Sequence, residues 1–524
     1  MQSTKPGNPI LNLIKKTMIK RLATILTVIP AFCFAQWTQL GNGINGIQAG
    51  EFLGSTHSLA MDSSGNTIAV GTYRNNTLFP YSGYARVLNW NGSAWIQRGS
   101  NLTSTDSTHT ATGYAVDLSA NGMTVAVGSP YGYNSSGFRS GIVRVFDWSG
   151  SNWVQKGLSI NGEGNANPIF SSDLFGSALQ LNADGNRLVV GGPKNTTAIG
   201  VNQLCGHVRV FHWNGSAWNQ IGQDIDAPLS FGTQEFGSAV SINDAGTRVA
   251  IGARAFTGSN SANQDMGLAM VLEYNGTSWV SLGDTLFGGG PSHKFGSAVQ
   301  LSSNGNTIAV GAPGANSFQG LTKVFDWNGS QWIQRGADIA GLMSGQSGTS
   351  VGLSSNGNRI AIGDPFANSL KGATRIFAWN SNTWQQLGNT ITLSGNAMDN
   401  FGSAVRLNDN GSKIVIGLPF NDQSANNAGQ VRVFENALLQ GSGESFNRLK
   451  LNVFPNPCMD FVQVRSDHEI TSYELFNLSG QLIDSSEVNN HLTLEINMFG
   501  LKEGTYILRL NTIGGITNLK LVKL

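Results

Sequence analysis

One motif repeats seven times along most of the chain, and this repeat limits the possible folds more than any other feature. The segment FGSAVQLSSNGNTIAVGAP at residues 295–313 represents it. Every copy has a turn glycine and, six residues later, a second glycine. The turn glycines are Gly65, Gly122, Gly185, Gly246, Gly305, Gly357 and Gly411, and the second glycines are Gly71, Gly128, Gly191, Gly252, Gly311, Gly363 and Gly417. Successive turn glycines are 57, 63, 61, 59, 52 and 54 residues apart. Periods of about this length indicate a propeller, a solenoid or an array.

Each unit predicts four short strands. In the template, SAVQL alternates small or apolar residues with polar ones, and SSNGN is a tight turn in which Asn and Gly tolerate positive φ. IAV is a short apolar run, as expected for a strand buried on both faces. A second block, KVFDWNGSQWIQRG at residues 323–336, predicts a hairpin. Its Trp327 and Trp332 lie on one face, where they can pack as a cross-strand pair.

Seven units of four antiparallel strands fit a β-propeller better than a parallel β-helix or a solenoid. The ends of the repeat region favour a closed ring. The seventh unit ends at VRVFEN, residues 431–436, without the tryptophan-containing last strand, and QWTQLG at residues 36–41 supplies such a strand at the other end. We therefore expect Trp37–Gly41 to complete the last blade. The predicted fold class is all-β: a seven-bladed β-propeller closed by the N-terminal strand, followed by a small β-sandwich C-terminal domain.

Composition excludes several classes of protein. Charged residues are 12% of the chain, the formal net charge is +1, and no run of like charges occurs, so nucleic acid is not an expected partner. Cys33, Cys205 and Cys458 are too few for a disulfide scaffold and match no metal-ligand spacing. No zinc-protease motif, phosphate-binding loop or nucleophile elbow is present. We therefore predict no catalytic residue, no metal site and no cofactor.

The Phe-Gly starts of several units and their Gly-x-Pro finishes resemble FG-GAP repeats, the blades of the integrin α-subunit propeller. The starts are Phe175-Gly176, Phe236-Gly237, Phe295-Gly296 and Phe401-Gly402, and the finishes are at 311–313, 363–365 and 417–419. Units 1, 2 and 6 depart from this pattern, with Ser55, Thr112 and Ser347 at the expected Phe position. Calcium-binding FG-GAP repeats carry several aspartates in one loop, whereas these turns hold one carboxylate at most. We interpret them as plain β-turns, since Ca²⁺ takes six to eight oxygen ligands.

The N-terminus predicts a secretory signal peptide. Two cationic pairs, Lys15-Lys16 and Lys20-Arg21, precede an apolar stretch at residues 22–34 that is too short to span a bilayer. We place the signal peptide at residues 1–35, with Met18 as an alternative start and cleavage after Ala35. Processing at Cys33 as a lipoprotein is a weaker alternative, because the bulky Phe32 precedes it. No other run of 18 apolar residues occurs, so we expect no transmembrane helix in the mature chain.

The C-terminal segment differs in composition and carries its own signature. NVFPNP at residues 452–457, YELFNLSGQLI at 473–483, LKEGTYILRL at 501–510 and the ending KLVKL resemble the type A C-terminal sorting domain of the Bacteroidetes type IX secretion system. The resemblance implies contact of residues 447–524 with the type IX secretion machinery, passage across the outer membrane, and a secreted or cell-surface location. An immunoglobulin-like accessory domain is the alternative. The predicted division is a propeller at 36–440, a Gly/Ser-rich linker at 441–446 and the sorting domain at 447–524.

Loop variation indicates where a ligand would bind. The turns between first and second strands and between third and fourth strands are short and alike in all units. The links from second to third strand and from blade to blade differ in length and content, and by topology they share the opposite face of the ring. Variable loops on a rigid scaffold are common recognition sites. The candidate ligand-binding residues on these loops are Tyr73, Arg74, Tyr81, Tyr131, Tyr133, Arg139, Phe256, Phe318, Phe366 and Lys371.

Two recurring sets of residues are better explained as scaffold. The tryptophan pairs hold a fixed place in each outer hairpin, so we expect them to pack between blades and not to form a carbohydrate ladder. The pairs are Trp90/Trp95, Trp148/Trp153, Trp213/Trp218, Trp327/Trp332 and Trp379/Trp384. A set of arginines occupies equivalent strand positions, which favours structural pairing. These are Arg86, Arg144, Arg209, Arg375 and Arg432.

The sequence favours a secreted or cell-surface propeller that binds or adheres to an extracellular protein or glycan. The alternative is a secreted polysaccharide-acting hydrolase or lyase with a site in the propeller channel. Such an enzyme needs two carboxyl groups about 5–10 Å apart at the axis. A third interpretation, a coat component without a discrete ligand, predicts a variable face without distinctive side-chain clusters.

Overall fold

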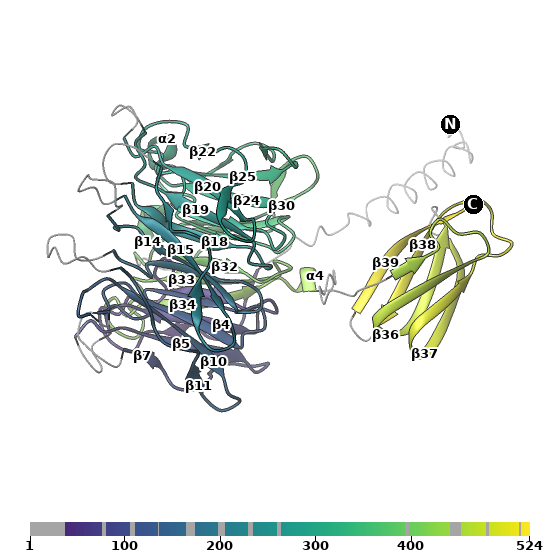
Figure 1. Ribbon diagram of the computed structural model, residues 1–524, viewed down its shortest axis with the longest axis horizontal. Coiled ribbons are helices and arrows are strands. Elements are labelled where there is room, and N and C mark those ends of the chain that lie inside the picture. The colour runs from purple at the N-terminus through teal and green to yellow at the C-terminus, as the bar shows by residue number, and fades with distance from the viewer. Residues whose placement is uncertain are drawn as a thin grey trace, which may run out of the picture.

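The structure is a computed structural model that describes residues 37–75, 80–104, 110–134, 136–163, 173–196, 205–228, 234–258, 264–393, 398–440, 452–477, 481–512 and 515–524. The predicted signal peptide and linker lie outside these ranges. Seven antiparallel sheets form a seven-bladed β-propeller, and five further strands form a separate C-terminal sheet (Figure 1). The predicted fold class is confirmed.

Each blade runs from an inner strand to an outer strand that is usually broken into two short pieces, both paired with the third strand. Blade 1 holds β3 (Leu59–Met61), β4 (Thr67–Thr72), β5 (Tyr84–Trp90), β6 (Trp95–Gln97) and β7 (Leu102–Thr103). Blade 2 holds β8 (Ala115–Leu118), β9 (Thr124–Ser129), β10 (Ile142–Trp148), β11 (Trp153–Gln155) and β12 (Ile160–Asn161). Blade 3 holds β13 (Ala178–Leu181), β14 (Arg187–Gly192), β15 (His207–Trp213), β16 (Trp218–Gln220) and β17 (Ile225–Asp226). Blade 4 holds β18 (Phe236–Ile242), β19 (Arg248–Ala253), β20 (Leu268–Tyr274), β21 (Trp279–Ser281) and β22 (Leu286–Phe287).

The remaining blades follow the same plan, and two of them contain a one-turn helical segment after the second strand. Blade 5 holds β23 (Ala298–Leu301), β24 (Thr307–Ala312), α2 (Ala315–Phe318), β25 (Leu321–Trp327), β26 (Trp332–Gln334) and β27 (Ile339–Ala340). Blade 6 holds β28 (Ser350–Leu353), β29 (Arg359–Asp364), α3 (Ala367–Leu370), β30 (Ala373–Trp379) and β31 (Trp384–Gln386). Blade 7 holds β32 (Val405–Leu407), β33 (Lys413–Leu418), β34 (Gln430–Glu435), β1 (Thr38–Gln39) and β2 (Ile44–Asn45), and α4 (Ala437–Gln440) follows it.

The N-terminal strand closes the ring, as predicted. β1 pairs antiparallel with β34, Thr38 opposite Glu435, and β2 pairs with the other end of β34. Trp37 is 8% exposed and belongs to the same apolar core as Phe401 and Phe434. The first and last parts of the propeller chain therefore form one sheet. An open solenoid would not join its ends in this way.

A ring of seven backbone hydrogen bonds joins the inner turns. The residue two positions before each turn glycine donates its N–H to the carbonyl oxygen of the equivalent residue in the next blade, at 2.8–3.3 Å. The order is Ser63, Ala120, Ala183, Asp244, Ser303, Ser355, Asp409 and back to Ser63. Each blade satisfies one donor and one acceptor of its neighbours, so the ring has no free end.

The second glycine of each unit is explained by a close approach between blades. A Cβ built on Gly71 would lie 2.0 Å from the carbonyl oxygen of Gly113 in blade 2. The same contact recurs in all seven blades at 1.9–2.1 Å, ending with Gly417 against Gly54. Any side chain at these positions would collide with the backbone of the next blade, so only glycine fits.

A second ring of hydrogen bonds runs around the outside through indole groups. In every blade the tryptophan of the outer strand donates its Nε1–H to a backbone carbonyl of the preceding blade, at 2.7–3.1 Å. The donors are Trp37, Trp95, Trp153, Trp218, Trp279, Trp332 and Trp384. The predicted inter-blade role of the tryptophans is confirmed, and Trp37 takes the place of an outer-strand tryptophan in blade 7.

One prediction about the repeat is wrong. Leu53, and not Ser55, occupies the Phe position of unit 1. Leu53 is fully buried, and its bridge to Gly429 matches the bridge of Phe401 to Gly372. The error arose because Leu53 precedes its turn glycine Gly65 by 12 residues, whereas Phe401 precedes Gly411 by 10. Two additional residues before β3 shift the alignment.

The C-terminal strands form one antiparallel sheet around their own core. They are β35 (Asn452–Phe454), β36 (Phe461–Asn477), β37 (Leu482–Asn497), β38 (Gly504–Thr512) and β39 (Gly515–Lys523). Register shifts between Arg465 and Ser472 divide the long β36–β37 hairpin into two halves. Residues of both halves, including Val462 and Leu475, share one buried cluster with Leu508 of β38. This arrangement agrees with the small all-β domain predicted for the C-terminus.

Loss of the closing strand should destabilise the ring far more than a substitution at an exposed residue of the same strand. We expect Trp37→Ala to lower the free energy of unfolding by about 3–5 kcal/mol, because it deletes a buried indole and its hydrogen bond. Deletion of residues 37–41 should cost more, since it also leaves the edge of β34 unpaired. Thr38→Ala, at an exposed position of the same strand, is the control and should change stability by less than about 0.5 kcal/mol. Denaturant unfolding of the chain from Gln36 measures all three, and an unchanged midpoint for the deletion would contradict ring closure.

Candidate functional site

The variable face, defined as the links from second to third strand and from blade to blade, carries most of the predicted ligand-binding residues. Tyr73 and Arg74 follow β4, Tyr131 follows β9, and Arg139 precedes β10. These loops therefore meet on one side of blades 1 and 2. The opposite side consists of the short turns that form the inner hydrogen-bond ring.

Seven side chains from blades 7, 1 and 2 gather into what we call the aromatic cluster. Its members are Phe52, Tyr73, Arg74, Tyr114, Tyr131, Arg139 and Phe420. Phe52 stacks on Tyr73 with ring centroids 6.0 Å apart, and Phe420 meets Phe52 edge-on at 5.4 Å. Tyr73 meets Tyr114 edge-on at 5.6 Å. The cluster is thus continuous across three blades.

Two guanidinium groups lie over rings of the aromatic cluster. Arg74 lies 5.2 Å from the Phe52 centroid and 5.4 Å from that of Tyr73, and Arg139 lies 4.6 Å from that of Tyr131. Each contact is within the range of a cation–π interaction. The result is a surface with apolar ring faces and cationic edges.

Partial burial favours the protonated hydroxyl groups of Tyr73 and Tyr114. Burial raises the pKa of Tyr73 and of Tyr114, and the neighbouring Tyr131 raises that of Tyr114 further. Arg74 and Phe420 are exposed and the tyrosine rings are half-buried. The cluster therefore offers water-accessible ring surface together with hydrogen-bond donors.

The other predicted residues do not join the aromatic cluster. Tyr81 and Tyr133 are about half exposed, on the β4–β5 and β9–β10 links that also carry Tyr73 and Tyr131. Phe256 is 6% exposed and packs on Phe287 with centroids 5.8 Å apart, within the core of blade 4. Burial makes Phe256 a core residue in place of the ligand contact that was predicted. Lys371 is half-buried directly after α3.

Phe318 and Phe366 line a second feature, which we call the blade 5–6 groove. This shallow groove of about 680 Å³ is also lined by Leu342, Met343 and Leu370. Met343 is 87% exposed and Phe318 is 50% exposed. The groove is apolar and open to solvent.

Left-handed turns shape the blade 5–6 groove. In α2 the backbone of Asn316, Ser317 and Phe318 has φ of 51°, 55° and 66°, and α3 repeats this at residues 368–370. Consecutive residues in this region cost about 1–2 kcal/mol each, because Cβ approaches the next carbonyl oxygen. Strained backbone of this kind tends to occur at binding sites.

Sequence reasoning missed three members of the aromatic cluster: Phe52, Tyr114 and Phe420. A signal for Phe420 was available, because it lies three residues after Gly417, as Tyr131 lies three residues after Gly128. Phe52 and Tyr114 lie on blade-to-blade links, where the repeat alignment is weakest. Whether Phe52 and Tyr114 join the cluster depends on which loops meet in the fold, and the sequence does not show this.

Side chains of the innermost strands connect neighbouring blades around the axis of the propeller. The seven residues that lie five positions before the turn glycines occupy equivalent places on the innermost strands, and Asp117 is the one acid among them. They are Ala60, Asp117, Gln180, Ser241, Gln300, Gly352 and Arg406. Asp117, Gln180 and Ser241 each accept a backbone N–H of the next blade, at 2.8–2.9 Å. These polar side chains hold neighbouring blades together.

The cavities along the axis are small. One of about 110 Å³ lies inside the ring of turns and is lined by Asp117, Gln180 and Arg406, among others. Another of about 20 Å³ lies beside His57 and Arg406. Ligand sites usually measure about 300–1,000 Å³. Three acids, Asp117, Asp244 and Asp409, line the larger cavity, but its volume is below that of a usual ligand site, so it does not provide the open channel that the hydrolase alternative needs.

The recurring arginines serve the scaffold. Arg86, Arg144 and Arg209 each donate from Nη2 to a backbone carbonyl on the outer strand of the preceding blade, at 2.6–2.9 Å. Arg375 makes the same contact through Nη1 at 2.9 Å. The structural pairing predicted for these four residues is confirmed.

The sequence predicted no metal site, because no ligand-type residues occur at metal-binding spacing. The fold, however, brings together residues that are distant in the sequence. Within the described ranges, the one group of three metal-type ligands that lie close to one another is Glu163, His207 and Asp224. The inner turns offer no comparable group, because their side-chain oxygens already accept backbone N–H groups. Asp62, for example, accepts those of Asn66 and Thr67 at 2.8 Å.

Comparison with known proteins identifies the C-terminal domain. Residues 452–523 match the family described as "Secretion system C-terminal sorting domain". This match supports the predicted type IX sorting domain. It indicates export, interaction with the secretion machinery and a secreted or cell-surface location. No curated protein matches the chain.

A similar solved structure is a putative 6-phosphogluconolactonase from Bacteroides uniformis. The two share 8% identity with a TM-score of 0.43, over 64% of this chain and 85% of the other. A likeness at this level carries no information about activity. Among the helices of the described residues, none is both long enough and apolar enough to cross a membrane.

Replacing Asp117 by Asn should stabilise the propeller more at alkaline than at acidic pH. Burial raises the pKa of Asp117 to about 7, outweighing its hydrogen bond from Leu181 N–H and the attraction of Arg406. Because the unfolded carboxyl titrates near 3.8, the folded state binds more protons between about pH 4 and 7 and loses stability as pH rises through that window.

Melting curves at pH 5 and pH 8 test this. We expect the Asp117→Asn protein to gain stability relative to the parent on going from pH 5 to pH 8, by an amount on the order of a few kcal/mol. Burial lowers the pKa of His57 to about 3, so His57 also contributes to the pH dependence of stability. Its contribution is the same in both proteins and cancels in the difference between them. A difference that does not change with pH would show that Asp117 is ionised in the folded protein throughout.

The sorting domain should direct export independently of the propeller. We expect residues 447–524, fused to an inert passenger with a signal peptide, to carry the passenger to the cell exterior in a host with type IX secretion. Fractionation of cells and medium measures this. A fusion that retains the passenger but replaces residues 447–524 by a Gly/Ser segment is the control and should stay in the periplasm. Periplasmic retention of both fusions would contradict the sorting role.

Proposed function

We propose that this protein is an extracellular binding protein whose variable face takes a protein or glycan ligand through the aromatic cluster. The observation that carries the proposal is the continuity of that cluster. Aromatic rings and two guanidinium groups from blades 7, 1 and 2 meet on one face, with Arg74 and Phe420 exposed. Export of the chain gives such a face access to ligands outside the cell.

The chemistry of the aromatic cluster suits recognition. Tyrosine and arginine are enriched where binding energy concentrates, because they bury a large apolar surface while keeping hydrogen-bond donors. The rings of Tyr73 and Tyr131 can stack on the apolar face of a sugar ring or fill a protein pocket. Arg74 and Arg139 are held over these rings, so part of the ordering cost is met before a ligand arrives.

The blade 5–6 groove supports the same function from a second position on the variable face. Phe318 and Leu370 lie in left-handed turns that keep them exposed, and Met343 is exposed beside them. We treat it as an extension of the ligand surface and not as a separate activity.

We also infer that the blades are of the FG-GAP type. Phe175, Phe236, Phe295 and Phe401 are fully buried, and the paired glycines that define each unit meet across the blade boundaries. Both features give a physical role to the residues that carry the resemblance. The aspartate-rich loops of the calcium-binding members are not part of this inference.

Binding should depend on the aromatic cluster and not on exposed apolar residues elsewhere. We expect the chain from Gln36 to Leu524 to bind specific members of a glycan or protein array. Tyr73→Ala and Tyr131→Ala should each weaken that binding by about tenfold or more, as loss of a contact worth over 1 kcal/mol does. Titration calorimetry with the array hit measures the affinity of each variant.

Ile96→Ala is the matched control, because Ile96 is 51% exposed on an outer strand away from the variable face. It should bind as the parent does. Equal affinities for the parent and for both tyrosine variants would refute the proposed surface, and melting curves of the variants establish that they are folded.

A further inference from the structure

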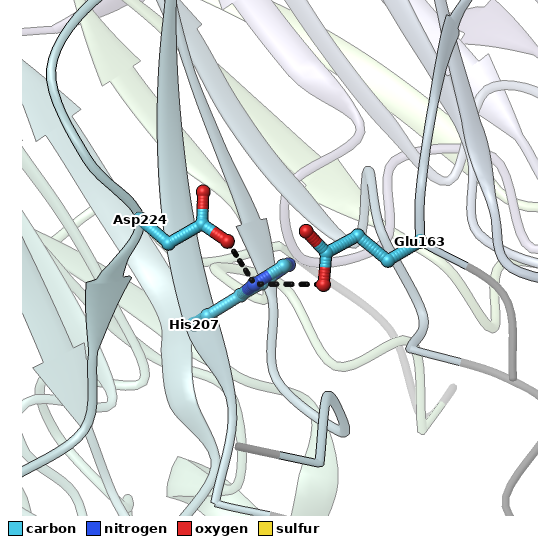
Figure 2. A group of neighbouring side chains, drawn as sticks. All are labelled: Glu163, His207 and Asp224. Atoms are coloured by element: carbon cyan, nitrogen blue, oxygen red, sulfur yellow. Dashed lines mark ion pairs between the residues drawn. The ribbon is translucent and has the colours of Figure 1, made fainter. Parts of the chain in front are cut away.

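A polar cluster at the junction of blades 2 and 3 is not explained by the propeller scaffold. Glu163 follows β12 on the link that leaves blade 2, His207 is the first residue of β15, and Asp224 directly precedes β17. Figure 2 shows both carboxylates pointing at the imidazole ring. His207 Nδ1 lies 4.0 Å from Glu163 Oε2 and 3.9 Å from Asp224 Oδ2.

The imidazole of His207 is buried and has no hydrogen-bond partner. Its side chain is 1% exposed, and within the described residues neither Nδ1 nor Nε2 has a partner. A buried polar group left unpaired lowers the stability of the folded state. The two carboxylates that face Nδ1 are too distant to be its acceptors, since a hydrogen bond requires about 3.2 Å or less. The separation leaves space for an atom between the three groups.

The position of the imidazole fits a ligand role. Its Nδ1 faces both carboxylates, and neither ring nitrogen is bonded to a described residue, so the ring can offer a lone pair to an ion.

The surrounding charges leave a local excess of negative charge. Glu163 Oε2 and Asp224 Oδ2 both face His207 Nδ1, so two acidic side chains share a small space. Asp173, which accepts the Glu163 backbone N–H at 2.8 Å, adds a third carboxylate. One cation faces the group, Arg209, whose Nη1 lies 3.9 Å from Glu163 Oε1. With all three carboxyls ionised the group carries a formal charge of −2, which a divalent cation would neutralise.

Hydrogen bonds outside the group hold the carboxylates in place. Asn195 Nδ2 donates to Glu163 Oε2 at 3.2 Å, and Gln220 Nε2 donates to Asp224 Oδ1 at 2.6 Å. Ligating carboxylates in metal sites are commonly oriented by such partners. Asp224 Oδ2, the atom that faces His207, is the oxygen that Gln220 leaves free.

Blade 1 shows what the same positions do as plain scaffold. Glu51 and Asn75 of blade 1 correspond to Asp173 and Asn195 of blade 3, and Tyr84 occupies the place of His207. Tyr84 donates its hydroxyl to Glu51 Oε2 at 3.2 Å, so that blade satisfies its polar atoms internally. In blade 3 the corresponding side chain is an imidazole that faces two extra carboxylates and bonds to neither.

We propose that Glu163, His207 and Asp224 bind one divalent transition-metal ion, of which Zn²⁺ fits best, and that this ion fastens the link leaving blade 2 to blade 3. One imidazole nitrogen and two carboxylate oxygens are a ligand set that Zn²⁺ accepts, with metal–ligand distances of about 2.0–2.2 Å. Two ligands at such distances and tetrahedral angles lie roughly 3.3–3.5 Å apart. The observed 3.9 and 4.0 Å need a contraction that the two partly exposed acidic side chains can make. Water would complete the coordination.

Titration calorimetry with ZnCl₂ on the chelator-treated chain from Gln36 to Leu524 tests the proposal. We expect one equivalent of Zn²⁺ with a micromolar or lower Kd, no comparable binding of Mg²⁺, and a rise of roughly 2–5 °C in Tm at saturating Zn²⁺. Zinc X-ray absorption should show one imidazole nitrogen with oxygen ligands at about 2.0–2.2 Å. No stoichiometric binding by the parent chain would overturn the proposal.

Single variants locate the site. His207→Ala should weaken Zn²⁺ binding by at least about 100-fold. Glu163→Gln and Asp224→Asn alter partly exposed side chains and should fold normally, so they remain informative if His207→Ala does not fold; each should weaken binding by at least about tenfold. His212→Ala is the matched control, since His212 lies half-buried on the same strand and contacts the backbone of Asn186 instead. Undiminished Zn²⁺ binding by Glu163→Gln and Asp224→Asn would place the ion elsewhere and refute the assignment.

Discussion

The hydrogen bonds between blades are the interactions on which the whole structure depends. A four-stranded blade cannot bury both of its faces alone, and each of these blades also exposes donors and acceptors that only a neighbour satisfies. The inner ring of turn amides, the glycine contacts and the outer ring of indoles are three levels of one junction, repeated seven times. A repeated junction of this kind is satisfied throughout only when the last blade meets the first. Trp37 and β1 make the final junction possible, because they bring an indole and a strand from the start of the chain to blade 7.

Because of these junctions, the two faces of the propeller have different roles. One face consists of turns that donate and accept in the inner ring, so its residues are constrained by the neighbouring blade. At the axis, Asp117, Gln180 and Ser241 are occupied in the same way, each accepting an amide of the next blade. On the variable face the residue at the Phe position of each unit donates its backbone N–H to the preceding blade, at 2.7–3.2 Å. Between these fixed points the loops differ in length and content without breaking the ring. The aromatic cluster and the blade 5–6 groove both lie on these loops.

Much of the fold was predictable because the repeat constrains it locally. The turn glycines, the tryptophan hairpins and the missing outer strand of the seventh unit predicted the blades and the closure. Leu53 was misaligned because two additional residues precede β3, and periodicity does not reveal an insertion of that size. The aromatic cluster was predicted only in part. Tyr73 and Tyr131 were found because they follow the repeat glycines, whereas Phe52 joins them through a contact that depends on loop conformation. Phe256 was misjudged because a loop position does not reveal that the loop folds back on the core.

A repeat protein also provides its own standard for judging which polar residues are unusual. In blade 1, Glu51 before the first strand is hydrogen-bonded to Asn75 after the second strand. In blade 7, Asp399 and Asn421 form the same pair. Such pairs belong to the scaffold, since they appear wherever the repeat permits them and satisfy one another. Asp224 also occupies a recurring position, since Asp338 in blade 5 accepts the same bond from the glutamine four residues earlier. His207 and Glu163 are additions in blade 3, and the imidazole has no partner among the described residues. Other buried side-chain atoms at the junctions, such as Arg86 Nε, also lack a hydrogen-bond partner within the described ranges, so an unpaired imidazole alone would not single out this place. The reason to assign an ion there is that two carboxylates face the same unpaired nitrogen.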